Sequence, residues 1–131
     1  MKQLSETLTE ALKINSKSKV NIKRNLENWS ILNAQDGDII HWNDSDLFFM
    51  YKCLNEGKKY SQASENAIVY HCVYYSDNRQ MVEIGPGTGV GTTDNSKAFK
   101  LASEKECEKF YEALDKAGYI WDDVKLKLVK K

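Results

Sequence analysis

The sequence has little proline, glycine and cysteine, and this excludes several large classes of protein. One proline and seven glycines among 131 residues exclude collagen-like repeats and proline-rich disorder. Its three cysteines, Cys53, Cys72 and Cys107, are odd in number and widely separated, so they indicate neither a disulfide framework nor a zinc knuckle. Each lies among apolar neighbours, which is typical of a buried free thiol.

Long apolar segments are also lacking. No run approaches the roughly 18 apolar residues that a membrane-spanning helix needs. The segment from Met1 to Leu12 carries Glu6 and Glu10 and has no uninterrupted apolar core, so it does not resemble a secretory signal. We therefore expect a cytoplasmic protein that does not associate with membranes.

An excess of charge of one sign is absent as well. The 19 basic and 19 acidic residues cancel, which excludes a strong overall field for nucleic acids or membranes but not a local patch. Only Arg24 and Arg79 are arginines, so few guanidinium groups are present for bidentate recognition of phosphate. The length of 131 residues and the 41% hydrophobic content are typical of one globular domain.

The first 33 residues differ from the rest of the chain. Leu4, Leu8 and Leu12 recur every four residues and predict a short helix from about Leu4 to Lys13. So short a helix needs something to pack against, so we expect it to dock on the domain, on a partner, or on a second copy in a homo-oligomer. A basic linker follows, and residues 34–131 form the single domain. The linker's basic residues are Lys17, Lys19, Lys23 and Arg24.

The domain is expected to begin with β-strands. Apolar and β-branched residues bounded by turn signals predict two hairpins. The residues of both sides of these strands are largely apolar, which is typical of a barrel or a covered sheet. The four strands are Ile39–Trp42, Leu47–Leu54, Ala67–Tyr75 and Gln80–Ile84.

A helix is expected to follow the strands. Ser103 with Glu106 three residues later forms a capping box at its start, and Gly118 is placed to end it. Two short strands, Tyr119–Trp121 and Lys125–Val129, predict a terminal hairpin. The fold class is therefore α+β, either a small, strongly bent β-barrel or a bent, mainly open antiparallel sheet covered by the helix. The apolar face of the helix comprises Cys107, Phe110, Tyr111, Leu114 and Ala117.

Several sequence segments together carry a resemblance to a group of known proteins. They are Gly37–Trp42, Phe48–Lys52, Gly91–Asp94, Phe99–Glu104 and Ala117–Asp122. In these segments the chain resembles uncharacterised small proteins of gut anaerobes and their phages, whose barrel is similar to SH3-like domains. The resemblance implies an SH3-like barrel and an origin in a phage or mobile element, and it implies no activity.

The glycine-rich segment from Gly85 to Thr93 fits neither of two well-known phosphate-binding motifs. Gly91 is followed by Thr92 rather than by the lysine of a Walker loop, and Val90 occupies the place of the third glycine in the dinucleotide fingerprint. We therefore interpret this segment as a flexible connection between a strand and the helix.

Enzymatic chemistry has weak support. His41 lies near Asp44 and Asp46, which leaves open a small hydrolase or a metal-dependent enzyme. His71 and Cys72 are adjacent on a strand and point to opposite faces, so they do not form a nucleophile pair. No catalytic residue, metal ligand set or cofactor is predicted.

Aromatic residues on the strands are the best candidates for a binding surface. Because neighbouring strand residues point in opposite directions, we expect one aromatic face to be partly exposed and to bind a peptide or stacked bases. The predicted function is a non-enzymatic protein-interaction module, an accessory protein of a phage or mobile element. The candidate residues are Trp42, Phe48, Tyr51, Tyr70 and Tyr74.

Binding of single-stranded nucleic acid is the alternative function. It would use the same aromatic face together with basic residues from both ends of the chain. Net neutrality makes a solvated surface the simpler interpretation of these charges. The basic residues are Lys17, Lys19, Lys23 and Arg24 in the linker and Lys125, Lys127, Lys130 and Lys131 at the C-terminal end.

Overall fold

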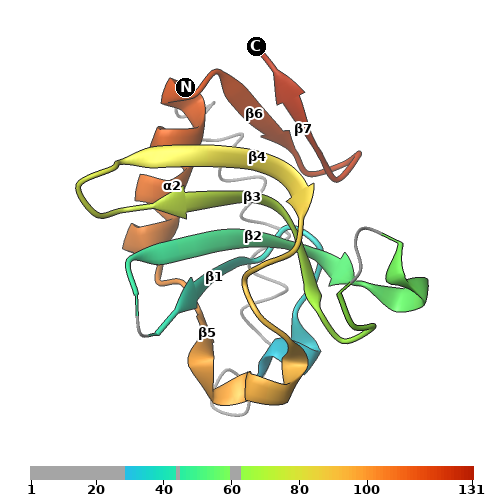
Figure 1. Ribbon diagram of the computed structural model, residues 1–131. Coiled ribbons are helices and arrows are strands. Elements are labelled where there is room, and N and C mark those ends of the chain that lie inside the picture. Colours follow the sequence, from blue (N-terminus) through green and yellow to red (C-terminus); the bar gives the residue numbers. More distant parts are fainter. Residues whose placement is uncertain (1–28, 44, 60–62) are drawn as a thin grey trace.

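The computed structural model describes residues 29–43, 45–59 and 63–131 (Figure 1). The predicted N-terminal helix with Leu4, Leu8 and Leu12 lies outside the described residues. The basic linker with Lys17, Lys19, Lys23 and Arg24 and the candidate Asp44 lie outside them too. In the described part, no helix is both long and apolar enough to cross a membrane.

An antiparallel sheet of five strands forms the centre of the fold. The strands lie in the order β4-β3-β2-β1-β5, and each neighbouring pair is antiparallel. Strands β4 and β5 lie at opposite edges and do not pair, so over the described ranges the sheet is open and no barrel is closed. The strands are β1 (Ile39–Trp42), β2 (Leu47–Leu54), β3 (Ile68–Tyr75), β4 (Met81–Gly87) and β5 (Phe99–Leu101).

The predicted helix is α2 (Glu104–Lys116). Ser103 Oγ accepts the backbone N–H of Glu106 at 3.1 Å, and Glu106 Oε1 accepts the backbone N–H of Ser103 at 2.8 Å, which confirms the capping box. Gly118 follows with a φ of +92°, a backbone conformation that favours glycine and ends the helix.

A hairpin of β6 (Tyr119–Asp122) and β7 (Lys127–Lys130) follows α2. Its turn is held by the carboxylate of Asp122, which accepts the backbone N–H groups of Val124 and Lys125, each at 3.0 Å. Three short 3₁₀ helices complete the described elements. They are η2 (Ile31–Asn33), η3 (Glu56–Lys58) and η4 (Thr93–Ala98).

Both faces of the sheet are covered. We call one the closed face: it packs against η2, η4 and the segment around Val90. Its buried residues are Ile31, Ile40, Phe49, Tyr51, Ile68, Val73, Val90, Ala98 and Phe99.

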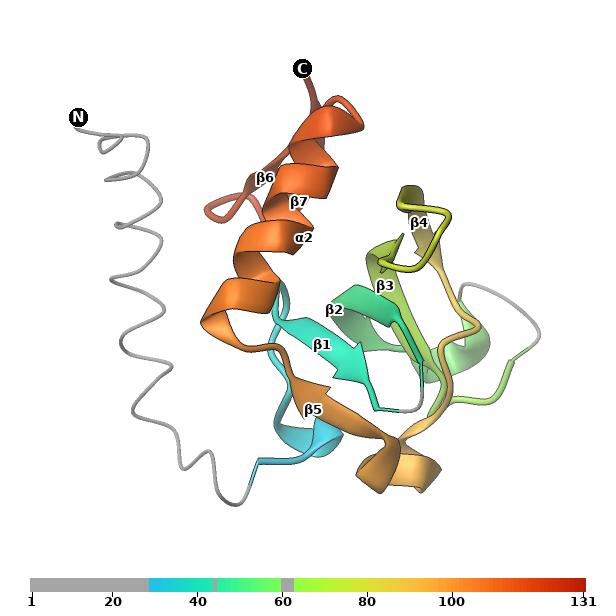
Figure 2. The ribbon, with the colours of Figure 1, turned by 90° about the vertical axis from the view of Figure 1, so that its left-hand side faces the viewer.

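The other face, here the helix face, packs against α2 and the β6–β7 hairpin. Helix α2 runs across the strands rather than along them, on one side of the sheet (Figures 1 and 2). The buried residues of the helix face are Ile39, Phe48, Met50, Cys72, Tyr74, Phe110, Leu114 and Trp121.

Strand β3 does not keep a regular alternation of side chains. The register with β4 shifts between Tyr70 and Cys72, so Tyr70 packs on the closed face while Cys72 and Tyr74 pack on the helix face. Simple alternation along β3 would place Tyr70 and Tyr74 on the same face, but the irregularity shifts the pleat by one residue and separates them.

The segment Gly85–Gly87 continues β4 and is not part of a flexible connection. A β-carbon at Gly87 would lie 2.8 Å from the hydroxyl oxygen of Tyr70, and one at Gly85 would lie 2.9 Å from the carbonyl oxygen of Tyr70. These two glycines therefore allow β4 to approach β3 closely beside the register shift. The interpretation of Gly85–Gly87 as a loop is wrong for this reason.

Candidate functional site

A groove of about 740 Å³ lies between α2 and one end of the sheet. The volume is within the range of about 300–1,000 Å³ that is usual for ligand sites. The sheet and the turns at its end contribute His41, Asp46, Phe48, Tyr74, Ser76, Gln80, Met81 and Val82, and the helix and its end contribute Glu106, Lys109, Glu112, Ala113, Lys116 and Ala117.

Four residues in one row across the sheet form the floor of the groove. His41 on β1 pairs with Phe48 on β2, Phe48 pairs with Tyr74 on β3, and Tyr74 pairs with Val82 on β4. Because directly opposed residues of neighbouring strands point to the same side, the pairing alone brings these four side chains together. Strand register therefore builds the floor.

The floor is aromatic and well packed. The His41 ring stacks on Phe48 with centroids 4.3 Å apart and planes 8° apart. Tyr74 meets Phe110 of α2 edge to face at 6.1 Å, and its hydroxyl donates to Gln80 Oε1 at 3.3 Å. These contacts hold the floor in one arrangement and attach it to the helix.

His41 connects the β1–β2 turn with the start of α2. Its Nε2 donates to the carbonyl oxygen of Ser45 at 3.0 Å, so Nε2 carries a proton, and Nδ1 lies 3.8 Å from Oε2 of Glu106. Nδ1 is buried and has no hydrogen-bond partner among the residues that the structure describes. The backbone N–H of Ser103 holds the pKa of Glu106 below its ordinary value, which keeps this carboxylate ionised.

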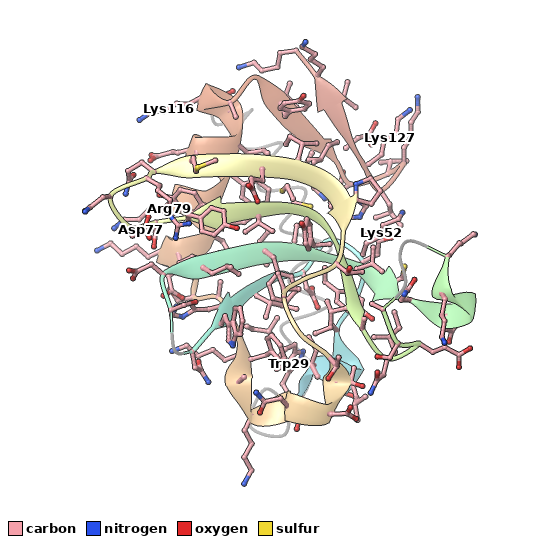
Figure 3. All side chains as sticks on the ribbon, in the orientation of Figure 1. Trp29, Lys52, Asp77, Arg79, Lys116 and Lys127 are labelled. Carbon is pink, nitrogen blue, oxygen red and sulfur yellow. The ribbon has the colours of Figure 1, made fainter. Side chains whose placement is uncertain are left out.

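Charged side chains of both signs form the helical wall. Glu106, Lys109, Glu112 and Lys116 follow one another at spacings of three or four residues, which places them along one side of α2. Lys116 extends from α2 on the same side of the molecule as the tip of the β3–β4 hairpin (Figure 3).

The hairpin tip is held by its own contacts. Arg79 pairs with Asp77 at 2.7 Å, and its guanidinium carbon lies 4.0 Å from the centre of the Tyr75 ring. The guanidinium is therefore already engaged beside the groove.

The structure separates the five predicted binding residues. Phe48 and Tyr74 line the groove, whereas Trp42, Tyr51 and Tyr70 belong to the closed face. The expected exposed aromatic face is wrong, because both faces of the sheet are covered: Phe48 and Tyr51 are each 8% exposed and Tyr74 is 6% exposed. Trp42 and Tyr70 are half-buried.

The described part of the alternative nucleic-acid surface is not a single surface either. Tyr51 and Tyr74 lie on opposite faces of the sheet, and neither is on the C-terminal hairpin that carries the lysines. Lys131 forms an ion pair with Asp115 of α2. The stacking residues and the C-terminal lysines are thus not brought together.

In the suggested enzyme site, His41 is paired with a carboxylate other than the expected Asp44 or Asp46. Asp46 lines the same groove, but among the described residues the carboxylate that forms an ion pair with the His41 ring is that of Glu106. Among the described residues no group of three or more histidines, cysteines and carboxylates is arranged to hold a metal ion.

The other candidate groups for nucleophilic chemistry are occupied or inert. His71 Nε2 lies 2.6 Å from Oδ1 of Asp36, and its ring packs on Trp121. Burial raises the pKa of the Cys72 and Cys107 thiols to about 12, and it raises the pKa of Cys53 as well. Because the thiolate is the nucleophile, these thiols are unreactive near neutral pH.

Sequence reasoning did not identify the helical wall. The sequence does contain one indication of this wall: charged positions flank the apolar stripe of the helix around Phe110 and Leu114. Which strand ends face that side of α2 depends on how the helix crosses the sheet, and no local pattern specifies it.

Comparison of the chain with protein-family models, with curated proteins and with solved structures found no match. Function is therefore inferred from the groove. It has an aromatic floor, a wall with charges of both signs, and a border of exposed residues that includes Gln80, Met81 and Lys109.

Proposed function

We propose that this protein is a non-enzymatic interaction module that binds an extended peptide segment of a partner protein in the groove between α2 and the sheet. The observation that carries the proposal is the row His41–Phe48–Tyr74–Val82, which presents an aromatic floor opposite a charged helical wall. If the chain shares the origin that its resemblance to phage and gut-anaerobe proteins implies, such a module would be an accessory protein of a mobile element. An open five-stranded antiparallel sheet is compatible with an SH3-like fold.

The composition of the groove favours a polypeptide over a small metabolite. Small-molecule sites usually enclose most of the ligand and are mainly apolar. Here exposed polar side chains border the groove on both sides, from Gln80 on the hairpin to Lys109 and Glu112 on the helix. A peptide offers backbone groups and alternate side chains to such a lining, with apolar side chains on the floor and polar groups at the border.

The groove can be blocked without disturbing the fold. Ala117 lines it, is exposed, and has helical backbone angles at the C-terminal end of α2, so an indole there is tolerated and projects over the groove. Val124, 82% exposed in the β6–β7 turn and not among the lining residues, offers a matched control position.

The test is a selection of random dodecapeptides displayed on phage against the full chain, followed by fluorescence anisotropy of the enriched peptides. We expect enriched peptides whose affinity falls at least tenfold in Ala117→Trp and is unchanged in Val124→Trp. Circular dichroism of both variants should match that of the parent protein. An absence of enriched peptides, or equal affinity for Ala117→Trp and the parent, would show that the groove is not a peptide site.

A further inference from the structure

We propose that the outer face of the β6–β7 hairpin is the docking surface for the predicted N-terminal helix of the same chain, residues 4–13, which lies outside the described residues. The inference goes beyond the proposed peptide binding and does not depend on it. It assigns a place to the stripe of Leu4, Leu8 and Leu12, because a helix this short needs an apolar surface to pack against.

The β6–β7 hairpin lies at the outside of the molecule, and its two faces differ (Figure 1). Trp121 and Leu128 are directly opposed in the register and pack on the core of the helix face, so their side of the hairpin is the inner one. Ile120 and Val129 are the neighbouring opposed pair, and they point to the outer side because side chains alternate along a strand. Ile120 is 53% exposed and Val129 is 38% exposed, so the described part of the chain leaves this outer pair largely uncovered.

Exposed apolar side chains are concentrated on this hairpin. Val124 and Leu126, in the turn between the two strands, are exposed as well. Four of the seven large apolar residues that are exposed in the described ranges therefore belong to the hairpin, and a cluster of this kind usually marks an interaction surface.

The size of the outer face fits one short helix and not a second copy of the chain. Two paired strands of four residues present a surface about 14 Å long and about 10 Å wide. The ten-residue helix predicted for residues 4–13 is about 15 Å long and about 10 Å wide. A stable dimer needs about 800 Å² from each partner, which is several times the area of this face.

The connection to the domain allows this placement. The described chain begins at Trp29, and residues 13–28 can span up to about 50 Å when they are extended. A globular domain of this length is about 36 Å across, so the predicted helix can reach the hairpin from Trp29. The tether also gives the helix an effective concentration of about 1 mM at its own domain, which favours docking within one molecule.

The groove between α2 and the sheet is a less suitable surface for the leucine stripe. Phe48 and Tyr74 in its floor are buried, so they offer three leucines little exposed apolar area. Since the gain from burying leucine is proportional to the apolar area that is removed from water, the exposed pair of Ile120 and Val129 is the better match.

The test is methyl NOESY NMR on the full chain with ¹³C-labelled isoleucine, leucine and valine methyl groups. We expect NOEs from the methyl groups of Leu8 to those of Ile120 and Val129. In a mixture of labelled and unlabelled protein, isotope filtering should assign these NOEs to contacts within one molecule.

Matched variants of the full chain test the leucine stripe. Leu8→Gln removes its central leucine, whereas Glu10→Gln introduces the same residue on the opposite side of the predicted helix. Leu8→Gln should speed amide hydrogen exchange in residues 4–12 at least tenfold, because it removes the burial of one leucine. Glu10→Gln should change the exchange less than twofold.

A second pair of variants tests the hairpin surface. Ile120→Lys places a charge in the docking surface, and it leaves the domain folded because Ile120 points outward. It should speed exchange in residues 4–12 as much as Leu8→Gln does. The control is Leu32→Lys, at a position in η2 that is 70% exposed and outside the hairpin, and it should leave this exchange unchanged.

Four results would overturn the inference. Two of them are NOEs from Leu8 to Val82 of the groove and NOEs between molecules. The third is amide exchange in residues 4–12 as fast as in an unstructured peptide, and the fourth is unchanged exchange of this segment in Ile120→Lys. Peptide binding in the groove is tested separately, by the Ala117→Trp experiment.

Discussion

The two faces of the central sheet are covered in different ways. On the closed face, irregular segments and 3₁₀ helices follow the sheet, and Ile40, Phe49 and Val73 are no more than 1% exposed. On the helix face, α2 and the β6–β7 hairpin bury Met50 and Cys72 completely but leave the row from His41 to Val82 beside a groove. An irregular segment can adapt to a twisted sheet, whereas a straight helix that crosses the strands cannot follow the whole surface.

The residues that stabilise the fold and the residues that line the groove therefore lie on opposite faces of the same sheet. Adjacent residues of β2 point to opposite faces, so Phe48 belongs to the groove and Phe49 to the closed core. The residues that could recognise a partner are thus one position away from those that hold the fold.

The largest expected effect comes from truncating these two phenylalanines. Phe49→Ala should lower the free energy of unfolding by about 3–5 kcal/mol, because it leaves a cavity that the closed face cannot fill. Phe48→Ala should cost about 2 kcal/mol, since the lost volume joins an open groove and adds little cavity energy. Urea unfolding measures both variants. Equal losses would mean that the helix face is packed as tightly as the closed face.

Local patterns allowed much of the fold to be predicted. The bounds of β1 and β2 agree with the expectation, and the capping box at Ser103 is confirmed, because alternation and capping are encoded by residues that are close in sequence. Strand β5 was missed: it has only three residues, and its pairing with β1 spans almost sixty positions of the chain. Its strand conformation comes from that pairing and not from its own sequence.

The groove could be predicted only in part for the same reason. Phe48 and Tyr74 were candidates because aromatic residues on strands are visible in the sequence. They lie beside His41 because of the strand register across β1, β2 and β3. Tyr70 is separated from Tyr74 because of the irregularity in β3. Neither the register nor the irregularity has a local signal.

The second prediction concerns the end of the helix face away from the groove. There Asp36 accepts a hydrogen bond from buried His71, the His71 ring packs on Trp121, and a β-carbon at Gly37 would lie 2.9 Å from the Trp121 ring. Asp36→Ala should cost about 1–3 kcal/mol at pH 7.5, because it leaves a buried N–H group without its partner. Thermal or urea unfolding gives the value, and a loss below 0.5 kcal/mol would show that this end is as loosely held as the groove.

The same pair gives a pH dependence with a definite sign. Burial lowers the pKa of His71, and the hydrogen bond that His71 donates to Asp36 offsets only part of that effect. The unfolded chain therefore binds a proton more readily than the folded one, so this contribution to stability is full above the ordinary histidine pKa of about 6.5 and is lost as the pH falls through the lower folded value. His71→Gln should reduce the fall in stability between pH 7.5 and 5.5, and an unchanged profile would assign the fall to other groups.

The smallest expected effect lies at the start of α2, where the groove and the helix cap share Glu106. Ser103→Ala removes the oxygen that accepts the Glu106 N–H and should cost about 1 kcal/mol of stability. Glu106→Gln keeps both capping bonds and should cost only a few tenths of that. Urea unfolding ranks the two variants. If Glu106→Gln destabilised the protein more than Ser103→Ala, the carboxylate would serve chiefly the fold and not the groove.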